Sequence, residues 1–359
     1  MYITSMDGSI RSARIHEYNK PLELDNISKP VIRGDEQVLV KVGATGLCHS
    51  DLHLINGEWK DILPLNLPKT PGHEISGWVE EVGKSVPENI VKPGDLVAVF
   101  GGWGCGSCIY CKSGDEQLCS YAKWPGLSSF DGGFSEYVLV PSYRFLVNVS
   151  GSEVNPENLA PLTDAGLTPY RAIKKIKSML GPGKKIGIIG IGGLGSYAVQ
   201  YAKILGSGAK IYALDRSNSK LELASKCGAD YQINIRTADN LVDRIRTDTE
   251  GKMLDVIIDC VGTDKTFYDS INILAKGGSI VVVGLFGTAA KIPIAMTVLN
   301  EYKIFGSLWG NYNELREVIE LLKDGKIKSN TTKYNLDDVN EAINLLKDGQ
   351  IVGRGVLIP

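Results

Sequence analysis

The segment Lys185–Gly195 reads KIGIIGIGGLG and joins an apolar strand to a glycine-rich turn. The last six residues, Gly190–Gly195, fit the pattern G-x-G-x-x-G, which by itself is a weak signal. Here a helix-like stretch follows at once, and the next apolar segment ends on an acid, Asp215, 20 positions after Gly195. Strand, turn, helix and acid in this order predict a βαβ unit that binds a dinucleotide.

The turn is expected to hold this cofactor through its backbone. Glycines allow a tight turn and a close approach to a pyrophosphate, which would lie on the N–H groups at the start of the helix. Asp215 would accept hydrogen bonds from the adenosine ribose and repel a 2′-phosphate, which favours NAD. Arg216 could accommodate that phosphate, which leaves NADP as the alternative. The predicted cofactor contacts are Gly190, Gly192, Gly193, Leu194, Gly195, Asp215 and Arg216.

Short apolar strands alternate with amphipathic helices from residue 185 onward. The expected strands are Lys185–Gly190, Lys210–Asp215, Tyr231–Asn234, Asp255–Cys260, Ser279–Gly284, Lys303–Ser307 and Gly353–Ile358. The expected helices are Leu194–Leu205, Ser219–Cys227, Asn313–Lys323 and Leu336–Lys347. This alternation predicts βαβ units around a parallel sheet.

Residues 10–150 show a different sequence pattern, in which short strands are separated by glycine and proline. Examples are Glu36–Val42, Ile75–Val82, Asp95–Phe100 and Phe134–Val140. Such a pattern predicts a β-rich domain and fits a small barrel. The pattern changes near Pro156, and the apolar residues of Leu159–Leu180 are then spaced as in a helix.

Composition narrows the possible functions. The 359 residues include 39 Lys and Arg and 41 Asp and Glu, so the net charge is −2. The chain therefore lacks the excess of basic residues that is typical of nucleic-acid-binding proteins. No segment approaches the roughly 20 apolar residues that span a membrane. The start, MYITSMDGSIRSARIHEY, has no apolar leader, so a cytoplasmic protein is expected. Its seven cysteines should then be thiols or metal ligands rather than disulfides.

Four of these cysteines lie within 15 residues, in the pattern Cys105-x2-Cys108-x2-Cys111-x7-Cys119. Four thiolates can close a tetrahedral zinc shell that leaves no position for a substrate, so such a site would be structural. An iron–sulfur cluster would also fit four cysteines. Zinc is favoured, because nothing else in the sequence indicates electron transfer.

A second group of metal-binding side chains comes earlier in the chain. Cys48 opens the run Cys-His-Ser-Asp-Leu-His, which ends at His53, and Gly72-His73-Glu74 follows. A thiolate and an imidazole, here Cys48 and His73, are ligand types of a catalytic zinc with three protein ligands. Local spacing does not identify the third ligand.

Taken together, these motifs resemble the zinc-containing medium-chain alcohol dehydrogenase family over nearly the whole chain. The resemblance runs from KVGATGLCHSDLH at Lys41–His53 to GRGVLIP at Gly353–Pro359. It implies a GroES-like β-rich catalytic domain, residues 1–165 and 306–359, with a zinc lobe at 101–122. It also implies a Rossmann doubly wound parallel-sheet domain for NAD at 166–305, with the active site in the cleft between the two.

The resemblance supplies the third ligand of the catalytic zinc. The family usually has a cysteine in a segment like A-P-L-T-C-A-G, whereas Ala160–Gly166 here reads APLTDAG, which puts Asp164 at that position. Similar secondary-alcohol dehydrogenases carry an aspartate there, and one thiolate plus one carboxylate still neutralises Zn²⁺. Glu74 resembles the family's optional ligand, and Asp51 the carboxylate that orients the zinc-bound histidine.

The remaining site residues also come from the resemblance. Ser50 would accept the substrate proton and pass it through the nicotinamide ribose to His53 and solvent. His49 and Arg354 match positions near the cofactor pyrophosphate, and Trp103 and Trp124 resemble residues that line the substrate pocket. Two cysteines match no ligand position and are expected to be buried small hydrophobes, Cys227 and Cys260.

The implied reaction is the reversible oxidation of a primary or secondary alcohol to an aldehyde or ketone, with hydride transfer to NAD. A polyol or amino-alcohol dehydrogenase, of sorbitol or threonine type, is one alternative. A zinc-free quinone or enoyl reductase is another, against which the cysteine cluster counts. From a different class, the chain could be a non-catalytic NAD-binding redox sensor. Two zinc ions per subunit and a homo-oligomer, dimer or tetramer, are expected.

Overall fold

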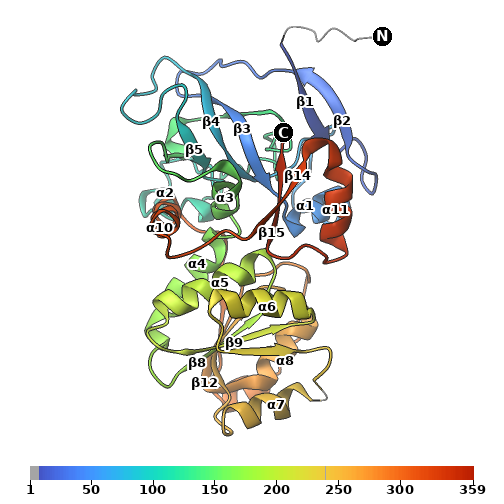
Figure 1. Cartoon of the computed structure of the whole chain (residues 1–359), viewed down its shortest axis with the longest axis vertical. Helices are drawn as coiled ribbons and strands as arrows, with labels where there is room; N and C mark the ends of the chain where they lie inside the picture. Colours follow the sequence, from blue (N-terminus) through green and yellow to red (C-terminus); the bar gives the residue numbers. More distant parts are fainter. Residues whose placement is uncertain (1–7, 239) are drawn as a thin grey trace. The chain divides into compact units, whose positions relative to one another are not determined.

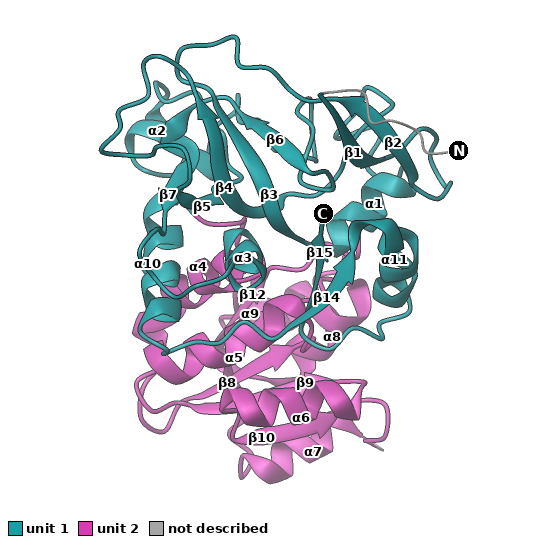
Figure 2. Ribbon diagram, turned by 45° about the horizontal axis from the view of Figure 1, so that its top comes forward, with its two compact units in different colours: residues 1–164, 311–359 teal, residues 165–310 magenta. Residues whose placement is uncertain are grey.

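The computed structural model describes residues 8–238 and 240–359, which form two compact units (Figure 1). Figure 2 shows unit 1, Met1–Asp164 together with Asn311–Pro359, in teal, and unit 2, Ala165–Gly310, in magenta. The chain therefore leaves unit 1 once and returns to it. The prediction that the chain starts without an apolar leader was made from residues 1–18, and the first seven of these lie outside the described residues. Within the described ranges, no helix is long and apolar enough to cross a membrane.

Unit 2 is built on a six-stranded sheet in which all neighbouring strands are parallel. The strand order is β10-β9-β8-β11-β12-β13, so the direction of winding reverses between β8 and β11. This confirms the predicted Rossmann fold. The strands are β8 (Lys185–Ile189), β9 (Lys210–Asp215), β10 (Tyr231–Asn234), β11 (Leu254–Asp259), β12 (Leu274–Val282) and β13 (Lys303–Gly306).

Helices cover this sheet on both faces. Right-handed crossovers put α5 and α6 on one face and α7 and α8 on the other, and α5 packs between α4 and α6 while α7 packs beside α8. Burial on both faces explains why strands such as Asp255–Cys260, DVIIDC, are almost wholly apolar. The helices are α4 (Leu167–Ile176), η4 (Lys177–Met179), α5 (Gly193–Leu205), α6 (Asn218–Cys227), α7 (Leu241–Asp248), α8 (Asp264–Ile273) and α9 (Ile294–Leu299).

Unit 1 contains the β-rich domain expected from the sequence, and its main sheet has seven strands. The order is β14-β15-β3-β4-β5-β7, with β6 paired to β3, and all pairs are antiparallel except β14 with β15. A separate hairpin joins β1 to β2. The strands are β1 (Ser9–Arg14), β2 (Glu23–Ser28), β3 (Val38–Gly46), β4 (Glu74–Val82), β5 (Leu96–Val99), β6 (Tyr137–Val140), β7 (Leu146–Asn148), β14 (Thr331–Asn335) and β15 (Arg354–Ile358).

The helices of unit 1 are short, except for the two near its C-terminus. In α10, Leu315, Val318 and Ile319 are buried at helical spacing, and Asn311 caps the first turn by accepting from the Glu314 N–H at 2.8 Å. The helices are α1 (His49–Ile55), α2 (Ile109–Lys112), η1 (Glu116–Leu118), η2 (Tyr143–Phe145), α3 (Pro156–Leu159), η3 (Ala160–Thr163), α10 (Tyr312–Lys323), η5 (Leu336–Asp338) and α11 (Val339–Lys347).

The helical spacing of Leu159–Leu180 does not produce one helix. Short turns, α3 and η3, come first, and α4 begins only at Leu167. Between them Asp164 has φ −141° and ψ −66°, which is not helical. The apolar spacing does reflect burial, because both the turns at 156–163 and helix α4 bury their apolar side chains. The non-helical backbone at Asp164, however, separates these two segments. The boundary between the two units falls at this interruption.

Candidate active site

The register of two antiparallel strands brings Cys48 and His73 together. β3 ends at Gly46, which pairs with Glu74, the first residue of β4. Cys48 lies two residues beyond the end of β3, and His73 lies one residue before the start of β4. The two side chains therefore meet at the same edge of the sheet, although a long loop separates them in the sequence.

Asp164 reaches the same place from the short helix η3, which packs against β3, β4, β5 and β15. Its Oδ2 lies 3.7 Å from Cys48 Sγ and 3.5 Å from His73 Nε2. One ligand atom from each of Cys48, His73, Glu74 and Asp164 lies within 4.8 Å of the others. Tetrahedral zinc with bonds of about 2.0–2.3 Å separates its ligand atoms by about 3.3–3.8 Å, so these donors fit a zinc ion.

Asp51 lies beneath this cluster and is fully buried. Its Oδ2 accepts from the Cys48 N–H at 2.9 Å, which caps helix α1. Its Oδ1 accepts from the Gly72 N–H at 3.3 Å and lies 3.3 Å from His73 Nδ1. One carboxylate thus holds the backbone of one candidate ligand and faces the ring of another, the arrangement that orients a metal-bound histidine.

The cluster attracts positive charge. Burial by itself would lower the pKa of His73, but the carboxylates of Asp51 and Asp164 raise it well above its ordinary value. Burial raises the pKa of the Glu74 carboxyl to about 7, against the opposing effect of Arg354. A buried site that stabilises a proton on an imidazole is also suited to a divalent cation, which would replace that proton.

Arg354, which the resemblance places near the cofactor pyrophosphate, also makes a contact that the sequence did not predict. Its guanidinium forms a two-pronged ion pair with Glu74, with Nε 2.9 Å from Oε2, and its Nη2 lies 3.6 Å from Asp164 Oδ2. The register explains this contact: β15 and β4 both pair with β3 at Gly46, and Arg354 is the first residue of β15, two positions before the residue that pairs with Gly46. A Cβ at Gly46 would overlap the Glu74 carboxylate. No sequence signal links residues 280 positions apart.

The predicted relay residues lie on α1. His49 and Ser50 form its first turn and are partly exposed, and His53 is buried in its last turn. The His53 ring bonds to Glu58 through Nδ1 and stacks on Trp59 with ring centroids 4.7 Å apart. Helix α1 and these two ring contacts were not predicted, and the only available signal was the polar Asn56–Glu58 turn after the helix.

The two tryptophans expected at the substrate pocket lie in neighbouring segments. A backbone bridge joins Trp103 to Lys123, which precedes Trp124. Trp103 is buried, with its ring 5.2 Å from that of Phe130, and Trp124 is partly exposed.

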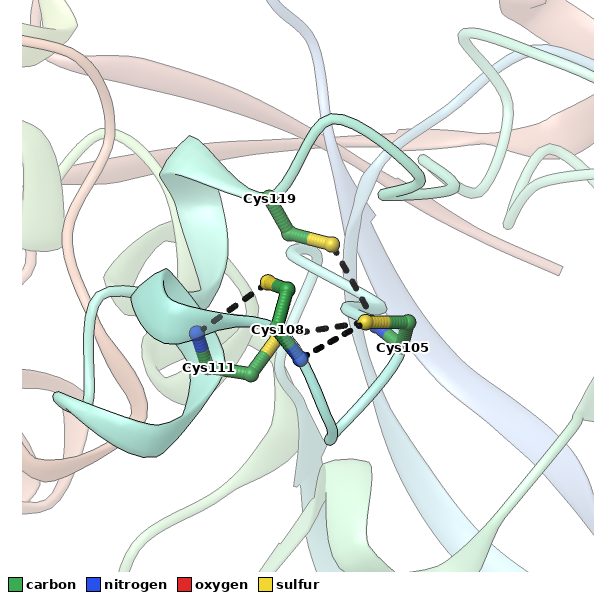
Figure 3. Close-up of side chains that lie close together, drawn as sticks. All are labelled: Cys105, Cys108, Cys111 and Cys119. Carbon is green, nitrogen blue, oxygen red and sulfur yellow. Dashed lines mark hydrogen bonds between the residues drawn. The ribbon is translucent and has the colours of Figure 1, made fainter.

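The four cysteines of the zinc lobe come together around α2 and η1, and Figure 3 shows their side chains close to one another. Cys105 Sγ lies 4.0 Å from Cys111 Sγ. Backbone N–H groups point at the sulfurs, with Cys108 N 3.4 Å from Cys105 Sγ and Cys111 N 3.5 Å from Cys108 Sγ. Hydrogen bonds from Ser107 lower the pKa of Cys105 to about 5, while burial raises that of Cys111 to about 12. The geometry fits a zinc ion held by all four sulfurs.

In unit 2 the glycine turn and Asp215 are in direct contact. Asp215 Oδ2 accepts from the Ile191 N–H at 2.6 Å, and Oδ1 accepts from the Ser217 N–H at 2.9 Å. Gly190 has φ +86°, and a Cβ at Gly195 would overlap the Gly190 carbonyl, so both positions require glycine. Gly192 and Gly193 start helix α5 beside them, with Leu194 in its first turn. Arg216 is exposed at the same edge of the sheet.

The expectation that two cysteines are buried small hydrophobes is wrong for Cys227, which is partly exposed. Cys260 is of intermediate exposure as a residue, but burial of its thiol raises the pKa of that group. Cys227 is the last residue of α6, and Cys260 follows the end of β11. None of the seven cysteines, all of which lie in the described residues, forms a disulfide.

Comparisons with known proteins agree with both units. Residues 34–151 match the family model "Alcohol dehydrogenase GroES-like domain", and residues 193–324 match "Zinc-binding dehydrogenase". An NAD-dependent alcohol dehydrogenase of Sulfurisphaera tokodaii is 42% identical over 98% of this chain and 100% of its own length.

Two further relatives show the range of the similarity. The alcohol dehydrogenase of Aeropyrum pernix has a crystal structure similar to this one, with TM-score 0.90, 36% identity and coverage of 97% of this chain and 100% of its own. A D-arabinose 1-dehydrogenase (NADP(+)) of Saccharolobus solfataricus is 34% identical over 97% of both chains.

Proposed function

The chain belongs to the zinc-containing medium-chain alcohol dehydrogenase family, and on this premise we propose that Cys48, His73 and Asp164 hold its catalytic zinc. It is an alcohol dehydrogenase that uses zinc and NAD and acts on a small alcohol or its carbonyl product. The observation that carries the ligand assignment is the convergence of these side chains within 4.8 Å. We assign the second, structural zinc to the four-cysteine lobe.

The zinc would act as a Lewis acid that lowers the pKa of the alcohol and stabilises the alkoxide. Asp51 keeps the His73 ring in place. Glu74 forms an ion pair with Arg354 while one of its carboxylate oxygens lies within 4.8 Å of the other donors, so Arg354 competes with the zinc for this optional ligand. Ser50 accepts the alcohol proton, and His53 delivers it toward solvent. In this scheme Arg354 and His49 also carry the cofactor pyrophosphate, and Trp103 and Trp124 line the pocket.

Residues 1–165 and 306–359 would form the catalytic domain, with the zinc lobe at 101–122, and residues 166–305 would bind NAD. The contact between Asp215 and the glycine turn supports the second part of this assignment. It also leads to a prediction about the choice between NAD and NADP.

Asp215→Ala is expected to weaken NAD binding and to raise the ratio of NADP to NAD use about tenfold, because the carboxylate that repels a 2′-phosphate is lost. The measurement is kcat/KM for each cofactor. Asp215→Asn is the matched variant, since its amide oxygen can still accept from the turn, and it should shift the ratio without loosening the turn. If both ratios equal that of the unchanged protein, Asp215 does not contact the ribose.

The substrate class is tested by a panel of ethanol, 2-propanol, benzyl alcohol, sorbitol and threonine with NAD. We expect turnover of the simple alcohols. A preference for sorbitol would favour a polyhydroxylated substrate, an alternative supported by the D-arabinose dehydrogenase among the relatives. A protein that contains zinc and NAD and turns over none of the panel would be a redox sensor instead.

We also propose a cytoplasmic homo-oligomer, dimer or tetramer. None of the seven described cysteines forms a disulfide, as is usual for a protein of a reducing compartment. Large apolar side chains are exposed throughout the segment 285–308 of unit 2, among them Ile294 at 74% and Leu299 at 79%. This segment contains β13, the edge strand of the sheet, and a second copy of the chain that packed there would cover both the edge and the apolar side chains.

Leu299→Glu is therefore expected to lower the mass of the assembly, as measured by light scattering after size-exclusion chromatography. A charge placed inside an apolar interface is costly, because it loses its hydration without gaining a partner. Ile62→Glu is the control, since Ile62 is 75% exposed in unit 1 and lies outside this segment. An unchanged mass for Leu299→Glu would mean that the subunits meet at another surface.

A further inference from the structure

The turn that follows helix α1 closes back onto His53. The Glu58 N–H donates to the His53 carbonyl at 2.9 Å, and the Glu58 carboxylate forms a hydrogen bond with His53 Nδ1. Gly57, between them in the sequence, has φ +67°, and a Cβ there would crowd the Tyr18 ring at 2.8 Å. The backbone of this turn is therefore built to return Glu58 to the histidine five positions earlier.

The contacts around the ring restrict its movement. Trp59 stacks on His53 with 22° between the ring planes, and the His53 side chain is 11% exposed. Asn56 Nδ2 donates to the other carboxylate oxygen of Glu58 at 3.0 Å. The Glu58 side chain nevertheless remains 49% exposed. One buried ring is thus connected, through a fixed carboxylate, to bulk water.

The chemistry of this pair specifies a tautomer. An ionised carboxylate only accepts hydrogen bonds, so Nδ1 of His53 must carry the hydrogen, and the basic lone pair of the neutral ring lies on Nε2. Hydrogen bonds from Asn56 and His53 lower the pKa of Glu58, which keeps its carboxyl ionised. When Nε2 takes up a proton, the adjacent negative charge stabilises the imidazolium, as the aspartate does in a Ser-His-Asp triad.

We propose that Glu58 is a positioning residue of the proton outlet, one that fixes the His53 tautomer and stabilises the protonated ring while its proton passes to water. The proposal rests on the proposed role of His53. The proton balance closes without a further reactant. The alcohol loses one proton, His53 gains it at Nε2, and the imidazolium releases one proton to water, which returns the neutral ring with its hydrogen on Nδ1 facing Glu58.

The test measures NADH formation in a single turnover of the zinc-loaded enzyme, so that slow release of the cofactor does not hide proton transfer. Glu58→Gln keeps an acceptor without the charge, and Glu58→Ala removes both. We expect the oxidation rate of Glu58→Gln to fall about tenfold and that of Glu58→Ala at least as far, with little change in KM. Added imidazole, a small diffusible base, should restore a large part of both rates and leave the unchanged enzyme unaffected.

Asn56→Ala is the matched control, because it removes the other hydrogen bond to Glu58 and leaves the pair with His53 in place. We expect it to keep the full rate. Rates of the two Glu58 variants equal to that of the unchanged enzyme would overturn the proposal. So would a loss that imidazole does not restore and that Asn56→Ala shares, since Glu58 would then only stabilise the turn.

His53→Gln separates this proposal from the proposed function. If it is slowed and the Glu58 variants are not, Glu58 has no part in an outlet that does exist. If His53→Gln itself oxidises alcohol at the full rate, the proposed relay fails, and the role of Glu58 fails with it. Zinc content and NAD affinity should stay the same in all four variants.

Discussion

Asp164→Ala is expected to lower the zinc content from two ions per chain to one and to reduce kcat by at least about a thousandfold. The reason is the geometry around Asp164 Oδ2, which lies 3.7 Å from Cys48 Sγ and 3.5 Å from His73 Nε2. Without this carboxylate, two protein ligands remain besides the optional ligand Glu74, too few for a tight site. Loss of a Lewis acid removes several kcal/mol of transition-state stabilisation, and about 4 kcal/mol corresponds to a thousandfold.

Asp164→Cys is the matched variant, since it restores the thiolate that the family usually has at this position. It should keep two zinc ions and measurable activity, because a thiolate carries the same charge as the carboxylate. The measurement is metal analysis beside steady-state kinetics. Two equivalents of zinc in Asp164→Ala would show that Asp164 is not a ligand.

Cys111→Ser in the zinc lobe should also remove one zinc, but with a different consequence. The lobe has only short helices and many exposed residues, so the metal contributes much of its stability. A loss of about 3 kcal/mol is expected, which in a unit of this size lowers Tm by roughly 6–12 °C. The catalytic zinc should remain, as metal analysis and thermal unfolding together would report.

Cys227→Ser is the control for this experiment, because Cys227 is also a partly exposed cysteine and lies outside the cluster. It should change neither zinc content nor Tm. An unchanged Tm and two zinc ions in Cys111→Ser would remove the structural role. Iron and visible absorbance in the purified protein would favour the iron–sulfur alternative.

The Rossmann unit was predictable because its signals are local. The apolar runs of β8 and β9, the glycine turn and Asp215 follow one another in sequence, and the structure joins them through the hydrogen bond from the Ile191 N–H. Strand limits at 210–215 and 231–234 agree with the expected ones. Buried parallel strands such as β8 appear as short apolar runs because both of their faces are covered, and the glycine turn that follows distinguishes this run from a helix.

Several contacts of the site could not be predicted from local sequence patterns. The helical period of Leu159–Leu180 continues across Asp164. Pro161, Gly166 and Pro169 indicate a break in the helix, but they do not predict that the Asp164 carboxylate meets Cys48 and His73 there. The pair of Arg354 with Glu74 depends on β15 and β4 flanking the same strand. Glu58 lies close to His53 in sequence, but only the turn at Gly57 brings its side chain back to the ring.

Periodicity, spacing and donor identity are properties of the chain, and they were sufficient to predict the class of fold, the family, the cofactors and the residue types that carry the chemistry. Which of those side chains meet depends on the folded structure. Contacts such as Asp164 with His73, or Arg354 with Glu74, follow from strand register and helix packing across long sequence separations. These contacts form because burial of the apolar strands fixes their register in one sheet. The polar residues at the strand ends, which are far apart in sequence, are thereby placed side by side.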